Sequence, residues 1–549
     1  MIRLRLPALL AVLAVALGPA VPAPAFAPRG GTLTLLHTGA ELVLDPARVT
    51  SAPVTQAALV LRRLTGWDAP PGEPPKLAPD LATDTGQTTD GGLTWTYTLK
   101  PGLRYEDGTP ITSADIKYGI ERTFAPEVTL SLAYHKTLLT GGDTYRGPAT
   151  GAGLDSIETP DARRVVFHLR TAYPDWPWVT STSAFTPVPR GNDDPRTYAA
   201  RPVASGPYRV GASEPGKRVV LERNPYWDRT TDPLRDAGPD RIVLEMGLTE
   251  AAQFDRVAAD TGTARDTIAL GMIPADRAAR ARQEPAVRRR LVHSEPSFLS
   301  YLALNNRRGA LRELKVRQAM QYAMDKAAYR RLLDGVNTLE PATTLIPPGM
   351  AGRVGYDLYP AGPSGDVATA KRLLAEAGHP ALRLTMRVED RPIALARARI
   401  VRRALARAGI TVEFRKIRSE AWLPTIRSGD TDFDLQIWGW TPDFPSPASS
   451  LQPLFGSREV PGGAGGGMNI TGYADPEVDA AMERALAEPD QRRALAQWAA
   501  LDQRIMRDAP VVPLLFQGVT VLHGSNVRGL SLTSSPNYVN FLRVSLKRD

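Results

Sequence analysis

The stretch from Leu93 to Phe124 decides the fold, and it reads L-T-W-T-Y-T-L-K-P-G-L-R-Y-E-D-G-T-P-I-T-S-A-D-I-K-Y-G-I-E-R-T-F. Apolar and polar residues alternate at 93–100, which predicts a half-buried strand. Pro101-Gly102 predicts a turn. Thr112 then caps a helix, with Asp115 three residues later as its capping-box partner. A strand, a turn and a helix therefore follow one another here.

The second half of the chain contains a strand, a helix and a second strand in succession. Residues 382–388 alternate as a strand, residues 393–408 have helical periodicity, and residues 410–417 form the next strand. Gly409 ends the helix between them. A β-α-β unit favours a parallel sheet with a right-handed crossover, so this half is α/β.

Further blocks along the chain resemble those of one known family. The stretch at 93–124 closely resembles the signature of the family 5 extracellular solute-binding proteins, which are the peptide-binding subunits of ABC importers. The other blocks stand in the family's order between about residues 31 and 515, and they lie at 201–210, 223–227, 241–246, 314–326, 370–378, 473–479 and 509–514. Their order over this length makes the resemblance specific.

The resemblance implies an α/β, two-lobed periplasmic-binding-protein-like fold with an extra subdomain in the first lobe. We expect a signal peptide at 1–27 and an extra subdomain of the first lobe at 71–197. The rest of the first lobe is expected in three segments, at 28–70, 198–300 and 511–549, and the second lobe at 301–510.

In the family, two strands cross between the lobes. The matching apolar strands are 302–305 and 511–516, so Asn305 and Pro513 are the predicted hinge residues. Two crossings make a hinge, and a ligand held between the lobes shifts the equilibrium between open and closed forms.

The segment at 433–447, F-D-L-Q-I-W-G-W-T-P-D-F-P-S-P, is the best site candidate. Its strand ends in a cluster that contains Trp438, Trp440, Thr441 and Asp443, and ligands of open α/β sheets bind beyond the carboxyl ends of strands. In the peptide-binding members, an Asp three residues after a Trp pairs with the α-amino group of the ligand. Asp443 stands at that position after Trp440, and such a charge-assisted bond contributes about 1.5–3 kcal/mol.

Other candidates rest on looser matches. The family often has a second Asp where this chain has Ser446, which leaves the ligand open. Glu41 follows the first strand, and Tyr134 and His135 follow the signature helix, where some members place an acidic and an aromatic ligand-binding residue.

Composition bounds the class of protein. A chain of 549 residues has room for two or three domains, and its formal charge is +9. Basic residues alternate with acidic ones, and the run Arg288–Arg290 has no interleaved aromatics, so we expect no nucleic-acid partner. The chain has no cysteine, which excludes disulfides, thiolate metal sites and a lipid anchor on Cys.

Residues 1–27 resemble an export signal. Arg3 and Arg5 precede the apolar run 6–17, which is too short to span a bilayer. Ala25-Phe26-Ala27 has the small-x-small pattern, although Pro28 disfavours cleavage after it, so Ala25 is the alternative cleavage position and an uncleaved anchor stays open. We expect the mature chain in the periplasm or on the outer face of the membrane.

Enzyme motifs are incomplete. The sequence at 211–218 nearly fits a phosphate-binding loop, but Arg218 stands where Ser or Thr must bind magnesium, so a hairpin turn is expected. The six histidines show no metal-ligand spacing, and there is no nucleophile elbow, so we expect no catalytic residue, cofactor or metal.

The expected protein is a monomer that delivers its ligand to an ABC permease. Alternatives are a sugar, an opine-like compound or a metal chelate as ligand, a sensing receptor, and an exported enzyme.

Overall fold

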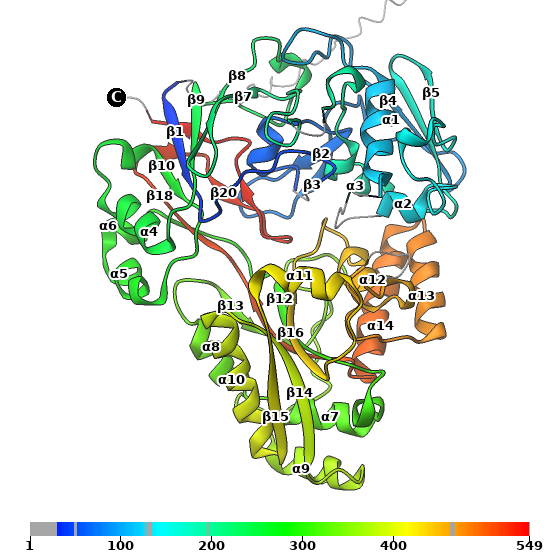
Figure 1. The fold of residues 1–549 in the computed structure, drawn as a ribbon, viewed down its shortest axis with the longest axis vertical. Coiled ribbons are helices and arrows are strands. Elements are labelled where there is room, and N and C mark those ends of the chain that lie inside the picture. Colours follow the sequence, from blue (N-terminus) through cyan, green and yellow to red (C-terminus); the bar gives the residue numbers. More distant parts are fainter. Residues whose placement is uncertain are drawn as a thin grey trace, which may run out of the picture.

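Two large sheets, one in each lobe, organise the chain (Figure 1). The computed structural model describes residues 30–48, 52–126, 128, 134–194, 197–461 and 467–547. The predicted signal peptide at 1–27 lies outside these residues. No helix in the described ranges is long and apolar enough to cross a membrane.

The sheet of the first lobe has seven strands and draws on three separate parts of the chain. Strand β1 (Thr32–Leu36) is central and runs parallel to both of its neighbours, β9 and β10. The strand order is β11 (Leu291–His293), β18 (Thr520–His523), β10 (Thr267–Ala269), β1, β9 (Arg241–Glu245), β8 (Arg218–Arg223) and β7 (Tyr208–Glu214). Residues 211–218 lie in the β7–β8 hairpin, as the sequence predicts.

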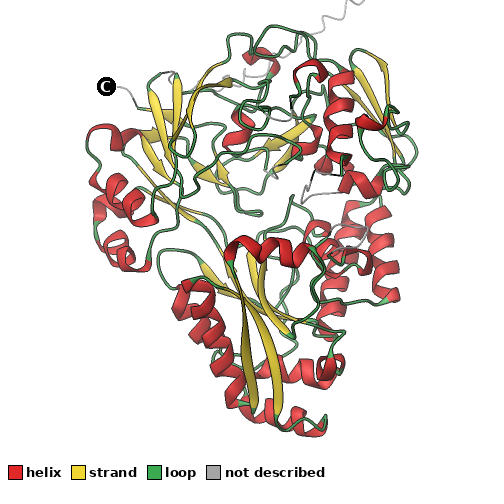
Figure 2. Ribbon diagram, in the orientation of Figure 1, coloured by secondary structure: helices red, strands yellow, loops and turns green. Residues whose placement is uncertain are grey.

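Helices α4 (Glu250–Ala259), α5 (Ala278–Gln283) and α6 (Pro285–Arg288) lie beside this sheet (Figure 2). Their apolar residues pack with Leu36 and Leu522 from the sheet, so helices and strands share one small core.

The extra subdomain contains the stretch that opens the sequence argument. Strand β4 (Thr94–Thr98) pairs with β6 (Arg164–His168), which pairs with β5 (Ile157–Asp161). Helix α1 (Ser113–Glu121) begins with the predicted capping box, in which Thr112 N donates to Asp115 Oδ2 at 2.8 Å. The subdomain also contains the short helices α2 (Tyr134–Leu138) and α3 (Trp176–Val179).

The proline-rich segment 69–79 is a surface connection in its first part and a strand in its last. Residues 69–75 join two strands, and the last four residues form β3 (Lys76–Pro79), which pairs antiparallel with β2 (Thr65–Asp68). Pro79 stands at the end of this two-stranded ribbon, a place where a missing N–H is tolerated.

The sheet of the second lobe has six strands. Strand β14 (Leu382–Glu389) runs parallel to β15 (Ile410–Ile417), and helix α10 (Pro392–Arg407) connects them, which confirms the predicted β-α-β unit. The strand order is β13 (Leu339–Pro341), β17 (Val511–Gln517), β12 (Phe298–Leu304), β16 (Leu435–Trp440), β14 and β15.

Two cores cover the two faces of this sheet. On strand β12, Leu302 and Leu304 join one core, whereas Tyr301 and Ala303 join the other. The first core is completed by α7 (Leu314–Ala323), α8 (Lys326–Leu333), α9 (Val367–Glu376) and α10, and the second by α12 (Ala448–Phe455), α13 (Pro476–Ala487) and α14 (Gln491–Arg507). Helix α11 (Ser419–Arg427) lies toward the first lobe (Figure 1).

The sequence predicts one helix at 314–329, but the structure has two. Helix α7 ends at Ala323, and Asp325 begins α8 by accepting a hydrogen bond from Ala328 N at 2.8 Å. An Asp side chain that bonds the local backbone favours a helix cap over a helix interior.

Two short segments carry the chain between the lobes. Residues 294–297 join β11 to β12, and residues 518–519 join β17 to β18. The segments also bind each other, because Ser294 N donates to Val519 O at 2.9 Å. A side chain on Gly518 would collide with Thr338 and Ser294, so this position requires glycine. The fold thus has the two expected crossings.

The predicted hinge positions need correction. Pro513 pairs with Tyr301 inside the second sheet, and Asn305 lies at the far end of β12, where its Nδ2 donates to Phe433 O at 2.9 Å. Both residues are buried parts of the second lobe rather than of the crossings. Apolar strands mark the sheet, whereas the crossings themselves are the short sequences Ser-Glu-Pro-Ser at 294–297 and Gly-Val at 518–519.

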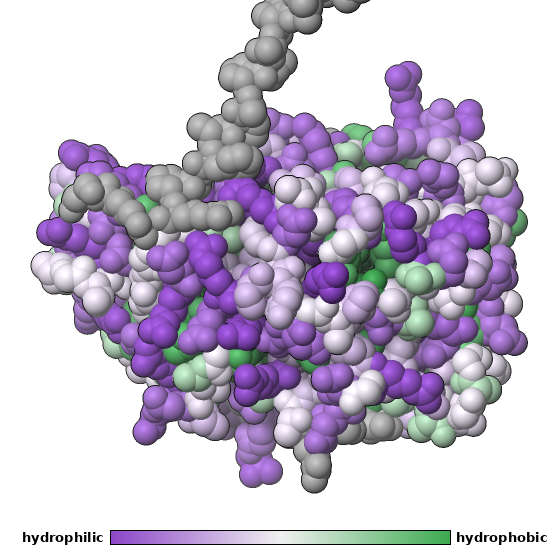
Figure 3. All heavy atoms as spheres, turned by 90° about the horizontal axis from the view of Figure 1, so that it is seen from above, coloured by the Kyte–Doolittle hydropathy of each residue, from purple (hydrophilic) through white to green (hydrophobic). Residues whose placement is uncertain are grey.

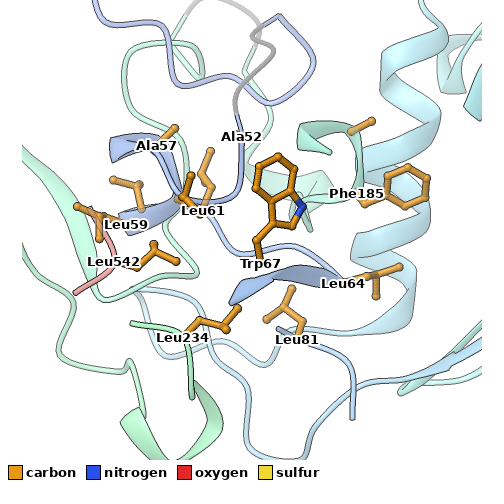
Figure 4. Packing of buried hydrophobic residues seen from close by; sticks show 14 of the residues in the cluster. Ala52, Ala57, Leu59, Leu61, Leu64, Trp67, Leu81, Phe185, Leu234 and Leu542 are labelled. Carbon is orange, nitrogen blue, oxygen red and sulfur yellow. The ribbon is translucent and has the colours of Figure 1, made fainter. Parts of the chain in front are cut away.

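The end of the chain returns to the core of the first lobe. Figure 4 shows Trp67 among labelled residues from early, middle and late parts of the sequence, including Leu234 and Leu542. Short strands complete this return, and they are β19 (Val527–Arg528), β20 (Ser531–Leu532), β21 (Val539–Asn540) and β22 (Ser545–Leu546).

The surface of the first lobe is mainly polar. Seen from above, it is mostly hydrophilic, with small hydrophobic areas between polar side chains (Figure 3). Large apolar side chains that are exposed in the described ranges are far apart in the sequence, for example Leu93, Met272 and Val354. The face in this view therefore offers no broad apolar patch.

Candidate ligand site

Asp443 lies where the second lobe meets the extra subdomain. It follows strand β16 in the loop that leads to α12, and it is half-buried. Tyr134 of helix α2 donates its hydroxyl proton to Asp443 Oδ2 at 2.7 Å. The neighbouring Phe444 is fully buried, and its ring centroid lies 5.3 Å from that of Tyr134. Asp443 therefore sits at a contact between the two lobes.

Burial raises the pKa of Asp443 to about 7, although its hydrogen bond from Tyr134 acts in the opposite direction. Burial also raises the pKa of Glu459, to about 7, and the pKa of Asp175. The Ser446 hydroxyl donates to Asp175 Oδ2 at 2.5 Å, which makes a second contact between the lobes. All three carboxyl groups are thus in surroundings that oppose their negative charge.

The negative charges of these carboxyl groups act on two buried tyrosines, Tyr134 and Tyr173. Burial raises the pKa of the Tyr134 and Tyr173 hydroxyls, and the charges of Asp443 and Glu459 raise both further. Asp175 acts on Tyr173 as well. The Tyr173 hydroxyl is buried and has no hydrogen-bond partner in the described part of the chain. It is a polar group with an open position beside the carboxyl groups.

No cation balances this group of acids within the described ranges. The pKa values of Asp443, Glu459 and Asp175 have no contribution from any Lys, Arg or His. Residues 462–466, which lie outside the described ranges, are Gly and Ala and carry no ionisable side chain. A buried carboxylate needs a partner, so this site favours a cation from another molecule.

The end of strand β16 connects these acids to a cavity. Trp440 Nε1 donates to Ser449 O at 2.8 Å, which ties the strand end to helix α12. Thr441 is half-buried between Trp440 and the Asp443 loop. Trp438, two residues earlier, lies beside Trp422 of α11 with ring centroids 6.3 Å apart.

A cavity of about 150 Å³ lies at Trp438, between the ends of β14 and β16 and the start of α10. Phe298 and Trp422 supply apolar walls. Arg387, Arg391 and Arg397 supply cations, and Glu389, which pairs with Arg391, supplies a carboxylate. Arg397 Nε and Trp438 Nε1 are buried without hydrogen-bond partners among the described residues. The cavity therefore presents unused N–H donors, one of them on a positive charge, to a ligand.

The comparisons with known proteins agree with this architecture. The family model described as "Bacterial extracellular solute-binding proteins, family 5 Middle" matches residues 76–462, well over half of the chain. The chain belongs to this family. As a family 5 solute-binding protein it has the two-lobed fold of that class, and groups of acids and histidines able to hold a metal are absent from its described residues.

Individual relatives of this solute-binding protein have been named for peptides. The probable D,D-dipeptide-binding periplasmic protein DdpA of Escherichia coli is 26% identical over 468 residues, which is 82% of this chain and 81% of DdpA. The structure of "Clavulanic acid biosynthesis oligopeptide binding protein 2" has 32% identity and a TM-score of 0.85, and the match covers 95% of this chain and 96% of that one. Helicobacter pylori DppA in complex with peptide STSA has 20% identity and a TM-score of 0.75, with coverage of 95% and 99%.

The structure brings together some of the predicted site residues of this solute-binding protein. Tyr134 contacts Asp443, and Trp438, Trp440 and Thr441 lead to it along one strand end. Glu41 lies apart, exposed in the loop after β1, and makes no side-chain hydrogen bond or ion pair within the described residues. Its predicted ligand role stays a prediction.

His135 needs correction, because it is part of the core. It is 1% exposed, and its Nε2 lies 2.7 Å from Thr123 Oγ1. Its ring packs edge-on against Phe124 and Phe185, and burial lowers its pKa to about 3. Adjacent residues of a helix point about 100° apart, and here Tyr134 contacts Asp443 whereas His135 contacts Thr123 and two phenylalanines.

Four residues of the site are missing from the sequence-based set. Tyr173 and Asp175 follow strand β6, Glu459 follows α12, and Arg397 lies in α10. Arg397 is one of several arginines in an ordinary helical pattern, and Glu459 reads as a loop residue. The segment at 433–447 is the only local signal that points to their meeting place.

Proposed function

We propose that this solute-binding protein captures a short peptide outside the cytoplasm and delivers it to an ABC permease. One observation carries the proposal. Among the described residues, Asp443 has no cation in contact and Arg397 forms no ion pair, and these two groups lie near the two ends of one segment, from Trp438 to Asp443. A peptide has the complementary pair of charges, an α-ammonium group at one end and a carboxylate at the other.

The spacing of these groups suits a small peptide. Trp438 and Asp443 are five positions apart in the sequence, so their Cα atoms are separated by at most about 18 Å. An extended peptide of five residues has about the same length. We therefore assign peptides of about two to five residues, with the amino terminus at Asp443 and the carboxylate toward Arg397.

Binding joins the lobes. Asp443 and Arg397 belong to the second lobe, whereas Tyr134 and Tyr173 belong to the first. A ligand that contacts both lobes favours the closed form by its difference in affinity for the two forms. The pair of crossings at 294–297 and 518–519 is the proposed hinge.

The setting follows from the same proposal. The chain is exported by residues 1–27, acts as a monomer in the periplasm or at the outer face of the membrane, and is not anchored through cysteine. It binds and releases its peptide unchanged, because the site offers charges and hydrogen-bond donors rather than a nucleophile with its base. The names of its relatives, which include dipeptide- and oligopeptide-binding proteins, support this assignment.

Peptides with blocked ends test the proposal. Calorimetry would compare free, N-acetylated and C-amidated alanine peptides of two to five residues on protein freed of retained ligand. We expect acetylation to weaken binding about tenfold or more, since it removes the cation that Asp443 needs, and amidation to weaken it by several-fold. Equal affinity for free and blocked peptides, or no binding of any of them, would contradict the proposal.

Scattering tests the closure. Small-angle X-ray scattering should give a smaller radius of gyration with saturating peptide than without it. An unchanged radius at proven saturation would indicate that the site is already formed in the empty protein, and would contradict movement at the crossings.

A further inference from the structure

The second lobe contains a second cavity, apart from the one at Trp438. It has a volume of about 290 Å³ and lies between the end of α7, the start of α8, strands β13 and β17, and the loop at 357–363. All of its lining residues belong to the described ranges, and none of them also lines the cavity at Trp438. Sites for small molecules have volumes of about 300–1,000 Å³, so this cavity has room for one small ligand.

The walls of this cavity are mainly apolar. They include the side chains of Met324, Ala327, Pro341, Pro363, Met506 and Pro513. The Tyr359 ring adds an aromatic wall, and its hydroxyl donates to Met506 O at 3.0 Å. The same ring packs edge-on against Tyr322, with ring centroids 5.9 Å apart. These contacts fix the ring, so the cavity offers a rigid apolar surface to a ligand.

Lys326 supplies a positive charge in this cavity. It is the first residue of α8 and is half-buried. Its Nζ donates to Ala342 O at 2.6 Å, which uses one of the three donors of an ammonium group. Among the described residues, Lys326 Nζ makes no other hydrogen bond and forms no ion pair, so two donors are left for a ligand.

The charged groups around the cavity favour an anion. Arg330 lies one turn after Lys326 on α8 and adds a second, exposed cation. Asp357 is the only acid among the described lining residues, and its Oδ1 accepts a hydrogen bond from Tyr359 N at 3.0 Å. Burial lowers the pKa of Lys326 to about 8, although the charge of Asp357 acts in the opposite direction, so Lys326 is still mostly a cation at pH 7. Two cations and one carboxylate leave a net positive charge, which one bound anion would balance.

We propose that this cavity is a second binding site of the protein, which takes a small aromatic or aliphatic carboxylate. The carboxylate group of the ligand pairs with Lys326, and its apolar body packs against Tyr359 and the two methionines. An inorganic anion would leave the apolar walls without contacts, and an uncharged ring would leave the ammonium group without an anion. The site does not depend on the proposed function, because it shares no lining residue with the cavity at Trp438.

Two probes that differ in charge test this proposal. Ligand-observed fluorine NMR on the full chain would measure the affinities of para-fluorobenzoate and para-fluorobenzyl alcohol, which have the same ring. Lys326→Met removes the charge and keeps an unbranched side chain. Lys371→Met is its control, since Lys371 is exposed on α9 and does not line the cavity. Ala361→Leu places a larger side chain in the cavity from a loop.

We expect the wild type and Lys371→Met to bind the acid at least about tenfold more tightly than the alcohol, and Lys326→Met to lose this preference. Ala361→Leu should weaken the binding of both probes by about fivefold or more, because it fills part of the cavity. Equal affinity of the wild type for both probes, or no binding of the acid at millimolar concentration, would overturn the proposal. A preference that persists in Lys326→Met, or binding that is unchanged in Ala361→Leu, would place the acid elsewhere and overturn the assignment. The result for Ala361→Leu decides if Lys326→Met does not fold.

Discussion

Two buried groups of charges in this protein contrast sharply. In the first lobe, Asp80 is fully buried between Arg62 and Arg235, whose nitrogen atoms lie 2.8 Å from its two oxygen atoms. Asp232 completes this group at 3.1 Å from Arg235. Burial raises the pKa of Asp80, but the two arginines outweigh it, and the pKa falls below its usual value. Around Asp443 no such cation is present in the described ranges, and the pKa rises.

The difference separates structural charges from charges kept for a ligand. The Asp80 group joins segments that are far apart in the sequence, and every member has an opposite charge in contact. The Asp443 group lies at the contact between lobes and has no cation in contact among the described residues. Acids of the same type thus stabilise the fold in one place and, under the proposed function, bind a ligand in the other.

The largest expected effect tests the structural group. Asp80→Asn should lower the free energy of unfolding by about 3–5 kcal/mol, because it leaves two buried guanidinium groups short of a partner. Asp443→Asn at pH 8 should cause no such loss. Urea denaturation would measure the free energy of unfolding of both variants, compared where this free energy depends on urea concentration with the same slope. Similar losses for the two variants would remove the contrast between the groups.

The next effect concerns the ligand group. Asp443→Asn should weaken the binding of a free peptide by about 1.5–3 kcal/mol, which is roughly 10- to 150-fold, because one charge-assisted bond is lost. Calorimetry with the alanine peptides measures it. The N-acetylated peptide serves as the control, since the substitution should change its weak binding little. Unchanged affinity for the free peptide would show that Asp443 does not bind its amino group.

The pH dependence of binding should follow from the raised pKa values. Asp443 and Glu459 have pKa values of about 7 in the empty protein, so both are largely protonated at pH 5.5. A cation favours the ionised forms and lowers both pKa values, so binding releases protons below pH 7. We expect peptide affinity to rise at least about tenfold from pH 5.5 to pH 8. Calorimetry in buffers of different ionisation enthalpy would measure the affinity and the proton release. An affinity that stays constant over this pH range would contradict the pairing of Asp443 with a ligand cation.

The smallest effect concerns the contact between the lobes. Tyr134→Phe removes the hydroxyl that bonds Asp443 but keeps the ring against Phe444. The melting temperature should fall by only about 1–2 °C, as expected for one hydrogen bond in a large protein. Tyr145→Phe is a control, since its hydroxyl bonds Ala152 O at an exposed position. A fall in melting temperature as large as that caused by Asp80→Asn would show that this contact also stabilises the fold.

The sequence predicts the fold where the signal is local. The capping box at Thr112 and Asp115 and the β-α-β unit at 382–417 depend on neighbouring residues, and both are confirmed. The boundary at Asp325 was missed because an Asp after an apolar helical face can end one helix and begin another. The crossings were misplaced because apolar strands are visible in a sequence, whereas a few polar residues between two sheets are not.

The candidate site was only partly predictable for the same reason. Asp443 and Trp440 belong to one short segment, and a resemblance can mark them. Tyr173, Glu459 and Arg397 come from three other parts of the chain, and only tertiary packing brings them near that segment. His135 shows the reverse case, because a residue next to Tyr134 in sequence points into the core.

The hydrogen bond between Tyr134 and Asp443 also bears on how an ABC importer avoids transport cycles without a bound solute. This bond joins the two lobes directly, from Tyr134 of the first to Asp443 of the second. In a medium at or above pH 7, an empty closed molecule must then either hold an extra proton on Asp443 or enclose an uncompensated charge. Under the proposed function, a peptide removes this conflict by bringing its own cation. Asp443 would then make empty closed molecules rarer as the medium becomes more alkaline, and a larger share of the closed molecules would carry a peptide.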